Sequence, residues 1–484
     1  MNWRVKPLDE ILANAERKAL RRSLGPFQLM MLGIGAIIGT GIFVLTAVGA
    51  ERAGPGLMLS FVIAGAVCAF AALAYAELSS MVPVAGSAYT YSYGVMGELV
   101  AWIVGWNLIL EYAVAASAVA VGWSGYMNGL LKSWDVHVPT AFTAGYFDLK
   151  GGGFGAGDGV VNLLAVAVVI AVCALLVRGT KESAAVNTAL VVVKLVALGF
   201  FVVIAIPNIN WDNFSPFMPY GFLSHEVFDA QLNADVSKGV MAAAALIFFA
   251  YVGFDAVSTA AEETRNPNRN VPIGLMGSLA LCTIIYLLVA AGAVGTMPTE
   301  ELKNSKEPLA EVLRNLGFQR IGDLIGVAAV LALPTVVMMM IFGQVRIFFA
   351  MSRDQLLPAS LSSVHPRFGT PWIMTIVTGV LVMLVAGFFS VDEIAELSNT
   401  GTLLAFIAVA AGVLVLRSTQ PDRPRPFRCP AVWIVAPLAI AGCLFLLASV
   451  PPKSLLRFAI WNAIGFAVYF LYSRSRSPLA PRAA

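Results

Sequence analysis

The chain alternates between long apolar stretches and short polar ones, a pattern that predicts a bundle of membrane-spanning helices. A helix needs about 20 mainly apolar residues to cross a bilayer. Stretches of this kind cover residues 26–50, 54–78, 98–130, 159–178, 184–206, 238–262, 271–296, 321–350, 371–390, 394–416, 430–450 and 455–473. Twelve crossings bring both ends of the chain to the same side of the membrane and leave little soluble mass.

The first and the sixth of these stretches are interrupted by glycine and polar residues near their middle. The first carries GIGAIIGTGIF from Gly33 to Phe43, and the sixth carries YVGFD from Tyr251 to Asp255. Backbone that leaves helical geometry inside a bilayer is tolerated where it lines a cavity. Paired interruptions in two halves of a chain are typical of a transporter's substrate site. Close helix packing through glycine is the alternative explanation.

The positions of the interruptions divide the helices into two units of five and leave two helices at the C-terminal end. Because five is odd, the second unit enters the membrane from the opposite side, which makes an inverted repeat. We therefore expect an all-α polytopic membrane protein with twelve transmembrane helices, a 5+5 inverted repeat, and helices 1 and 6 broken. The predicted parts are an N-terminal amphipathic segment 1–25, repeats 26–206 and 238–416, helices 11 and 12 in 430–473, and a tail 474–484.

Composition and charge agree with a membrane location. Hydrophobic residues make up 59% of the chain and charged residues only 12%, whereas soluble domains are about 25% charged. Lysine and arginine are about twice as frequent on the side of the two termini as on the other side, an excess that marks the cytoplasmic side. We expect cytoplasmic termini, with residues 8–24 lying along the membrane surface as an amphipathic helix. A role in gating or in docking a partner is the alternative for this helix. Basic loops account for the net charge of +3, so no nucleic-acid partner is needed.

Cysteine and histidine give no sign of a metal or redox site. The five cysteines and three histidines are scattered, without the spacing of metal ligands or of a redox pair. The chain also lacks a motif that pairs a nucleophile with a base. We therefore expect no metal, no cofactor and no enzymatic activity.

Leaving aside residues near the ends of the spans, three ionisable residues fall in their interiors: Glu111, Lys194 and Asp255. Such a residue costs at least about 2.5–3.5 kcal/mol at mid-membrane, and it is a functional candidate for that reason. Glu111 either assists the function or holds helices together through a buried partner. Asp255 either faces the substrate or organises the unwound segment.

Lys194 is the candidate for proton coupling. It lies about ten residues into its span, which places it about 15 Å deep, near the middle of the bilayer. Burial disfavours the charged ammonium, so the side chain can exchange a proton during a transport cycle. A permanent structural cation is the alternative.

The two interruptions offer opposite partial charges. A helix that restarts after Gly39-Thr40-Gly41 presents free N–H groups, which suit a carboxylate. A helix that stops near Phe249 leaves free carbonyl groups, which suit an ammonium. An α-amino acid carries both groups close together. Met338, Met339 and Met340 are candidates for an adaptable side-chain pocket, with a lipid-facing position as the alternative.

Three segments carry a family resemblance: GIGAIIGTGIF, FFAYVGFDAVSTAAEETRNPNRNVPIG and RIFFAMSRDQLLP. They resemble the amino acid-polyamine-organocation superfamily, and most closely a bacterial member of its cationic amino acid transporter family, over roughly residues 20–473. The resemblance implies the LeuT-type inverted-repeat fold shared with sodium-coupled neurotransmitter transporters. It also implies a location in the bacterial cytoplasmic membrane.

The resemblance further implies the roles of individual site residues. The substrate carboxylate would bind at Ile37, Thr40 and Gly41, beside Gly39. The substrate amino group would bind the backbone of Phe249, Ala250 and Val252. Lys194 stands where proton-coupled members carry a lysine in place of a sodium ion. Met340 stands where cationic-selective animal members carry a small residue, so its thioether favours a small neutral substrate such as alanine.

Together these features predict a proton-coupled symporter that takes up small neutral L-amino acids by alternating access, with broader or cationic specificity also open. A sodium-coupled carrier or an amino acid exchanger is the alternative within transport. A membrane-embedded amino acid sensor or channel is the alternative of another class. The expected partners are an L-amino acid, a proton and the lipid bilayer, and the sequence points to no particular accessory subunit.

Overall fold

The computed structural model describes residues 4–17, 24–84, 86–148, 155–156, 159–178, 183–229, 234–261, 264–303, 305–363, 365–368, 370–389 and 391–479. Helices form most of these residues, and each of the twelve predicted ranges contains a helix. The protein is therefore helical in the way the apolar pattern indicates.

The first predicted unit begins with an interrupted helix made of three pieces. These pieces are α2 (Pro26–Ile37), α3 (Thr40–Phe43) and α4 (Leu45–Ala53). The short helix η1 (Gly54–Gly56) leads into the remaining helices of the unit, which are α5 (Leu57–Met81), α6 (Ser87–Val95), α7 (Glu98–Ser133), α8 (Leu163–Arg178) and α9 (Ser183–Ala205).

The second predicted unit also begins with an interrupted helix. Its pieces are α10 (Val240–Ile247), η5 (Phe248–Tyr251) and α11 (Ala256–Thr259). The other long helices of this unit are α12 (Pro267–Thr296), α15 (Gln319–Arg353), α16 (Trp372–Phe388) and α17 (Val391–Thr419). The C-terminal part consists of α18 (Val432–Ala448), α19 (Pro452–Val468), the π-helical turn η8 (Tyr469–Ser473) and α20 (Arg474–Arg476).

The connections contain short helices and two small antiparallel hairpins. The hairpins pair β1 (Phe147–Asp148) with β2 (Gly155–Ala156), and β3 (His225–Asp229) with β4 (Ala234–Lys238). His225 lies opposite Lys238 in the second hairpin. The short helices are η2 (Thr140–Phe142), η3 (Ile206–Asn208), η4 (Trp211–Phe214), α13 (Thr299–Leu302), α14 (Pro308–Asn315) and η7 (Ala359–Ser362).

The helices are consistent with a polytopic membrane protein. Within the described residues, eight helical segments are long and apolar enough to cross a membrane. Four further apolar helices are shorter, and they are α2, α8, α16 and α18. The crossing of all twelve and the inverted relation between the two units remain predictions.

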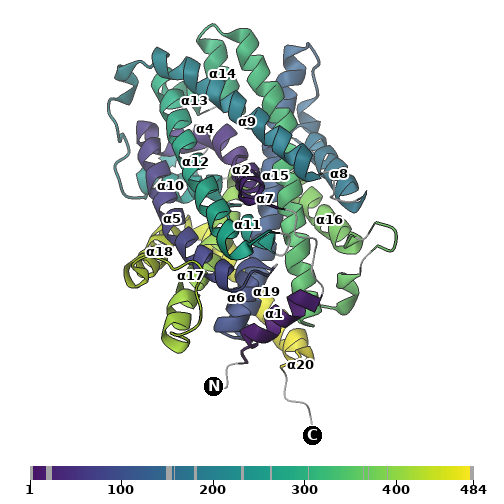
Figure 1. The fold of residues 1–484 in the computed structure, drawn as a ribbon. Coiled ribbons are helices and arrows are strands. Elements are labelled where there is room, and N and C mark those ends of the chain that lie inside the picture. The colour runs from purple at the N-terminus through teal and green to yellow at the C-terminus, as the bar shows by residue number, and fades with distance from the viewer. Residues whose placement is uncertain are drawn as a thin grey trace.

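The molecule has two distinct ends (Figure 1). The helices nearest the two chain ends, α1 (Leu8–Arg17) and α20, lie at one end, and α13 and α14 lie at the opposite end. Between them, α7 packs against α15 and α17, while α12 packs against α5 and α2. This arrangement places the residues around both interruptions inside the bundle, where they are buried.

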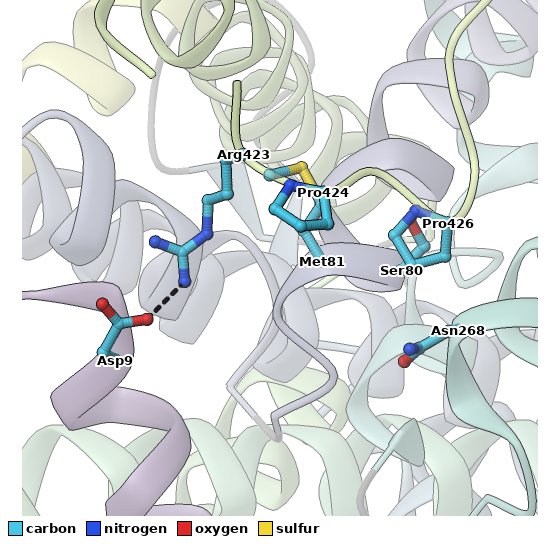
Figure 2. A pocket seen from close by; sticks show the side chains of 7 residues that line it. All are labelled: Asp9, Ser80, Met81, Asn268, Arg423, Pro424 and Pro426. Carbon is cyan, nitrogen blue, oxygen red and sulfur yellow. Dashed lines mark hydrogen bonds and ion pairs between the residues drawn. The ribbon is translucent and has the colours of Figure 1, made fainter. Parts of the chain in front are cut away.

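The N-terminal helix α1 packs on the protein as well as being amphipathic. Its apolar residues Leu8 and Ile11 are buried, and both side chains lie against Gly94 of α6. On its polar side, Asp9 accepts a hydrogen bond from Arg423 at 2.7 Å across a surface pocket (Figure 2). The apolar face that we expected on the membrane surface is therefore covered by protein. The rest of that expected helix, residues 18–23, lies outside the described residues.

Candidate functional site

The first interruption separates α2 from α3 at Ile38 and Gly39. Ile38 caps α2 in an extended conformation, and its N–H still donates to the carbonyl of Ile34. Gly39 is also extended, with φ −142° and ψ −150°, and it caps the N-terminus of α3. The helix therefore stops and restarts within two residues, so carbonyl groups of α2 and N–H groups of α3 lose their intrahelical partners.

The second interruption separates α10 from α11. The helix tightens into η5, and residues 252–255 then form a turn before α11 begins. Gly253 has φ +110°, a conformation that side chains with a Cβ rarely adopt. A Cβ at this position would also lie 3.0 Å from the carbonyl oxygen of Ala36 and 2.9 Å from Cε of Met340. Glycine at 253 therefore allows both the turn and a close approach of the two interruptions.

The two interruptions touch each other. A Cβ atom on Gly41 would lie only 2.3 Å from Cα of Ala250, so the two backbones are in direct contact there. The structure thus contains both interruptions that the glycine pattern predicts, and it brings them together in the interior.

A small cavity lies where they meet. Its volume is about 10 Å³, close to the room that one water molecule needs. It is lined by Ala36, Ile37, Gly39, Thr40, Gly41, Ala115, Val119, Phe249, Val252, Val336 and Met340. The cavity thus takes its lining from both interruptions and from two long helices, α7 and α15. The lining residues that the structure describes are all uncharged.

Most of the predicted substrate residues line this cavity: Ile37, Gly39, Thr40, Gly41, Phe249, Val252 and Met340. The sequence did not single out the other lining residues, which are Ala36 on α2, Ala115 and Val119 on α7, and Val336 on α15. No signal in the sequence separates them from the other small apolar residues of those helices. Met340, which the family resemblance separates from its two neighbouring methionines, is among the lining residues.

Thr40 contributes the polar side chain of the cavity. Its hydroxyl oxygen is buried and has no hydrogen-bond partner among the described residues. Gly122 of α7 makes room for it, because a Cβ there would lie 2.6 Å from the methyl carbon of Thr40. A buried hydroxyl without a partner can bind a polar group that enters the cavity.

Lys194 lies behind the first interruption. Its ammonium nitrogen is fully buried and donates to the carbonyl oxygen of Gly35 at 3.0 Å and of Ile38 at 2.9 Å. Both acceptors belong to the end of α2. The side chain therefore holds carbonyl groups that the interruption has released, and it does so from outside the cavity lining.

Two further side chains bind the interruptions, and the sequence reasoning missed both. Tyr286 of α12 places its hydroxyl 2.8 Å from the carbonyl oxygen of Ile37 and 2.9 Å from that of Ala250. The side-chain amide of Asn399 on α17 donates to the carbonyl groups of Ala245 and Leu246 at the end of α10. The available signal was a polar side chain inside an otherwise apolar span, which applies to both residues.

Asp255 is the last residue of the turn in the second interruption and Glu111 lies on α7, and neither lines the cavity. Asp255 accepts a hydrogen bond of 2.9 Å from the hydroxyl of Tyr112 on α7. Glu111, the neighbour of Tyr112, is buried, and among the described residues neither of its carboxylate oxygens has a hydrogen-bond partner of normal geometry. Within the same residues no lysine or arginine forms an ion pair with Glu111.

The described residues contain no group of three histidine, cysteine, aspartate or glutamate side chains that could hold a metal ion. The polar groups around the cavity are instead backbone groups and the hydroxyl of Thr40. These groups can bind and orient a small polar solute.

Comparison with known proteins gives a consistent result. The family described as amino acid permease matches residues 24–471. The branched-chain amino acid permease BcaP of Bacillus subtilis is 46% identical over 471 residues, which cover 97% of each chain. The methylthioribose transporter of the same organism is 42% identical over 478 residues, 99% of each chain. The cationic amino acid transporter 4 of Homo sapiens is 33% identical over 434 residues, 87% of this chain and 64% of the human one.

These matches run through both interrupted helices and the residues around the cavity. With the apolar helices, they identify a multi-pass protein of the cell membrane. The chain belongs to the amino acid permease family of the amino acid-polyamine-organocation superfamily, whose members here are transporters and not enzymes.

Proposed function

We propose that this protein is a proton-coupled symporter for neutral L-amino acids with small or branched apolar side chains, working by alternating access. The observation that carries the proposal is the cavity between two broken helices, which combines free backbone groups with an uncharged lining. The cavity has room for about one water molecule, so an amino acid enters only when the surrounding helices move apart.

The first interruption is proposed to bind the substrate carboxylate. The backbone N–H groups at the start of α3 and the unpartnered hydroxyl of Thr40 belong to the same short segment of the cavity lining. N–H groups at a helix start carry partial positive charge and favour an anionic group. Ile37, Thr40 and Gly41 are the proposed carboxylate residues, with Gly39 giving the backbone its extended shape.

The second interruption is proposed to bind the substrate amino group through the carbonyl oxygens of Phe249, Ala250 and Val252. Two of these oxygens already accept one hydrogen bond each: Phe249 from the N–H of Val252, and Ala250 from Tyr286. A carbonyl oxygen has two lone pairs, so each can accept a second bond from an ammonium. Asp255 is proposed to organise this segment through Tyr112.

The side-chain end of the cavity favours an apolar substrate. Ala115, Val119, Val336 and Met340 form its walls, and a cationic side chain among them would be buried without a partner, which is costly. The name of the relative BcaP, a branched-chain amino acid permease, agrees with such a substrate. Alanine, valine, leucine and isoleucine are therefore the proposed substrates.

Lys194 is proposed to couple a proton to this binding site. The protonated side chain has three charged N–H donors for the carbonyls of Gly35 and Ile38. The neutral amine has two N–H donors, and they form weaker hydrogen bonds. Gain or loss of the proton therefore changes how firmly the end of α2 is held, next to the proposed carboxylate site. Glu111 is proposed as an auxiliary proton carrier, because it is buried and has no cationic partner in the described part of the chain.

The proposed setting is the cytoplasmic membrane of a bacterium, with both termini in the cytoplasm and the end of the molecule that carries α13 and α14 outside (Figure 1). The 5+5 inverted repeat is part of the same proposal. It explains why the two broken helices face each other at the centre of the bundle.

Uptake by the purified protein in liposomes tests the proposal. The labelled solutes are alanine, leucine, isoleucine, arginine and methylthioribose, each with an imposed proton gradient, a sodium gradient or internal counter-substrate. The proposal requires accumulation of the neutral amino acids driven by the proton gradient. Accumulation driven only by sodium or counter-substrate identifies the alternative carriers, and equilibration without accumulation identifies a channel. Uptake of methylthioribose but no amino acid would refute the substrate class.

A further inference from the structure

Tyr286 contacts the backbone of both interruptions. Its hydroxyl lies 2.8 Å from the carbonyl oxygen of Ile37 in the first and 2.9 Å from the carbonyl oxygen of Ala250 in the second. The residue is fully buried on α12 and does not line the cavity. It therefore acts on the cavity through the backbone and does not touch its contents.

The two carbonyl groups depend on the same proton. A tyrosine hydroxyl has one hydrogen to donate, so the two acceptors share it or receive it in turn. A buried carbonyl without a donor is costly, and both groups are inside the protein. When either carbonyl moves away from the hydroxyl, the O–H group donates only to the other carbonyl. The positions of the two segments are therefore linked.

The position of the hydroxyl is fixed by the rings around it. The ring of Tyr286 lies 5.7 Å from that of Phe61 on α5 and 5.4 Å from that of Tyr251 in η5. Tyr251 in turn donates to the carbonyl of Phe61 at 3.0 Å. The ring that carries the donor thus packs against two other rings, one from α5 and one from η5 of the second interruption, so its hydroxyl is not held by the first interruption alone.

Lys194 provides a useful contrast. It contacts two carbonyls, but both belong to the first interruption. Asn399 also contacts two carbonyls, and both belong to α10. Among the side chains that bind released carbonyls in the described residues, Tyr286 bridges the two interruptions.

We propose that Tyr286 is a positioning residue that links the two unwound segments, so that they change their geometry together when an amino acid binds between them. The effect on substrate rests on the proposed function, whereas the link between the segments does not. Loss of the hydroxyl then loosens both segments and weakens substrate binding, while the rings and their packing remain.

The test compares Tyr286→Phe with the matched control Tyr251→Phe. Both variants lose one buried hydroxyl from the same aromatic cluster, but Tyr251 donates to α5 and not to an interruption. Hydrogen–deuterium exchange is measured by mass spectrometry on peptides covering residues 34–44 and 247–257, without substrate. Tyr286→Phe is expected to raise exchange about tenfold in both peptides, and Tyr251→Phe in the second peptide alone. A change confined to one peptide in Tyr286→Phe, or no change, would overturn the link.

Transport kinetics test the effect on substrate. Tyr286→Phe is expected to raise KM for leucine about tenfold, with the maximal rate changed less than twofold. An unchanged KM would refute the positioning role even if exchange increased.

A measurement on the unaltered protein covers the case in which the variant does not fold. Leucine is titrated into this protein, and the exchange of both peptides must slow with the same midpoint in leucine concentration. Different midpoints would overturn the proposal. If no amino acid binds, the exchange data without substrate still decide whether the link exists.

Discussion

The ammonium nitrogen of Lys194 lies 3.0 Å from the carbonyl oxygen of Gly35, at the point where the first broken helix ends. The same nitrogen lies 2.9 Å from the carbonyl oxygen of Ile38. A proton on Lys194 therefore strengthens two contacts to the segment that is proposed to bind the substrate carboxylate. This geometry connects the charge on Lys194 to the shape of the cavity.

Lys194→Ala is expected to abolish accumulation driven by a proton gradient and to leave exchange of internal for external amino acid. The alanine variant loses the exchangeable proton, and its two carbonyls lose their donor at a cost of about 1–3 kcal/mol each. Substrate affinity should therefore fall as well. Uptake into liposomes at external pH values from 5 to 8 measures the effect, and the variant should give a flat profile.

Lys194→Arg is the control for charge. Arginine keeps a positive charge and cannot lose its proton in proteins, so we expect substrate binding without proton-driven turnover. Full pH-dependent accumulation by the alanine variant would rule out Lys194 as the coupling residue. Full activity of the arginine variant would show that a permanent cation is sufficient.

Gly41→Ala is expected to abolish transport, because the new methyl group has no room. It would lie 2.3 Å from Cα of Ala250, which is backbone and cannot rotate away. Gly39→Ala is the matched control in the same segment. Its methyl group would lie 3.4 Å from the side chain of Val336, an ordinary contact, and the extended backbone at Gly39 accepts an alanine. Leucine uptake should fall to background in the first variant and persist, with a higher KM, in the second. Equal activity of the two variants would contradict this packing.

Met340→Ala is expected to shift specificity toward larger side chains. Met340 lines the cavity, and its shortening adds space where the substrate side chain is proposed to lie. A change of one or more methylene groups in an apolar pocket alters discrimination by about 1–3 kcal/mol, or 10- to 200-fold. The ratio of kcat/KM for phenylalanine and alanine should rise accordingly. Met339→Ala is the control, because Met339 is buried but is not part of the lining. A similar shift in both variants would place the specificity pocket elsewhere.

The interruptions and the lysine behind them could be predicted because their signals are local. Glycine at 39, 41 and 253 sits in apolar stretches where a helix is otherwise expected, and Lys194 is a charge in a lipid-soluble span. Each signal conflicts with its own surroundings in the sequence. Such conflicts are typical of functional sites, and the structure shows these residues at or beside the cavity.

The rest of the site depends on contacts between helices that the sequence does not encode locally. Ala115, Val119 and Val336 belong to spans that are apolar on every side, so periodicity does not distinguish the cavity face from the lipid face. The two acceptors of the Tyr286 hydroxyl, the carbonyls of Ile37 and Ala250, depend on how α12 packs against α2 and η5. The apolar face of α1 was expected on lipid for the same reason, since amphipathic spacing does not show what covers it.

Glu307 supplies a prediction about stability outside the spans. It lies at the start of α14, its carboxylate packs against Gly129 of α7, and it forms an ion pair of 2.9 Å with Arg314. Burial raises the pKa of the Glu307 carboxyl group, although Arg314 acts in the opposite direction. Arg314 also pairs with Asp323 at 3.0 Å, so it keeps one partner when Glu307 is neutral.

The sign of the pH effect follows from the raised pKa. Between the ordinary pKa of a glutamate and the raised value, the folded protein binds more protons than the unfolded chain, so folding becomes more favourable as the pH falls. Glu307→Gln resembles the protonated form and should match or exceed the unaltered protein in Tm at pH 7. The difference in Tm should shrink as the pH is lowered toward 5. Glu300→Gln is the control, at an exposed position in the same connection. Its difference in Tm from the unaltered protein should not shrink as the pH is lowered. A Tm for Glu307→Gln that is lower at pH 7 would show that the ion pair with Arg314 outweighs the cost of burial.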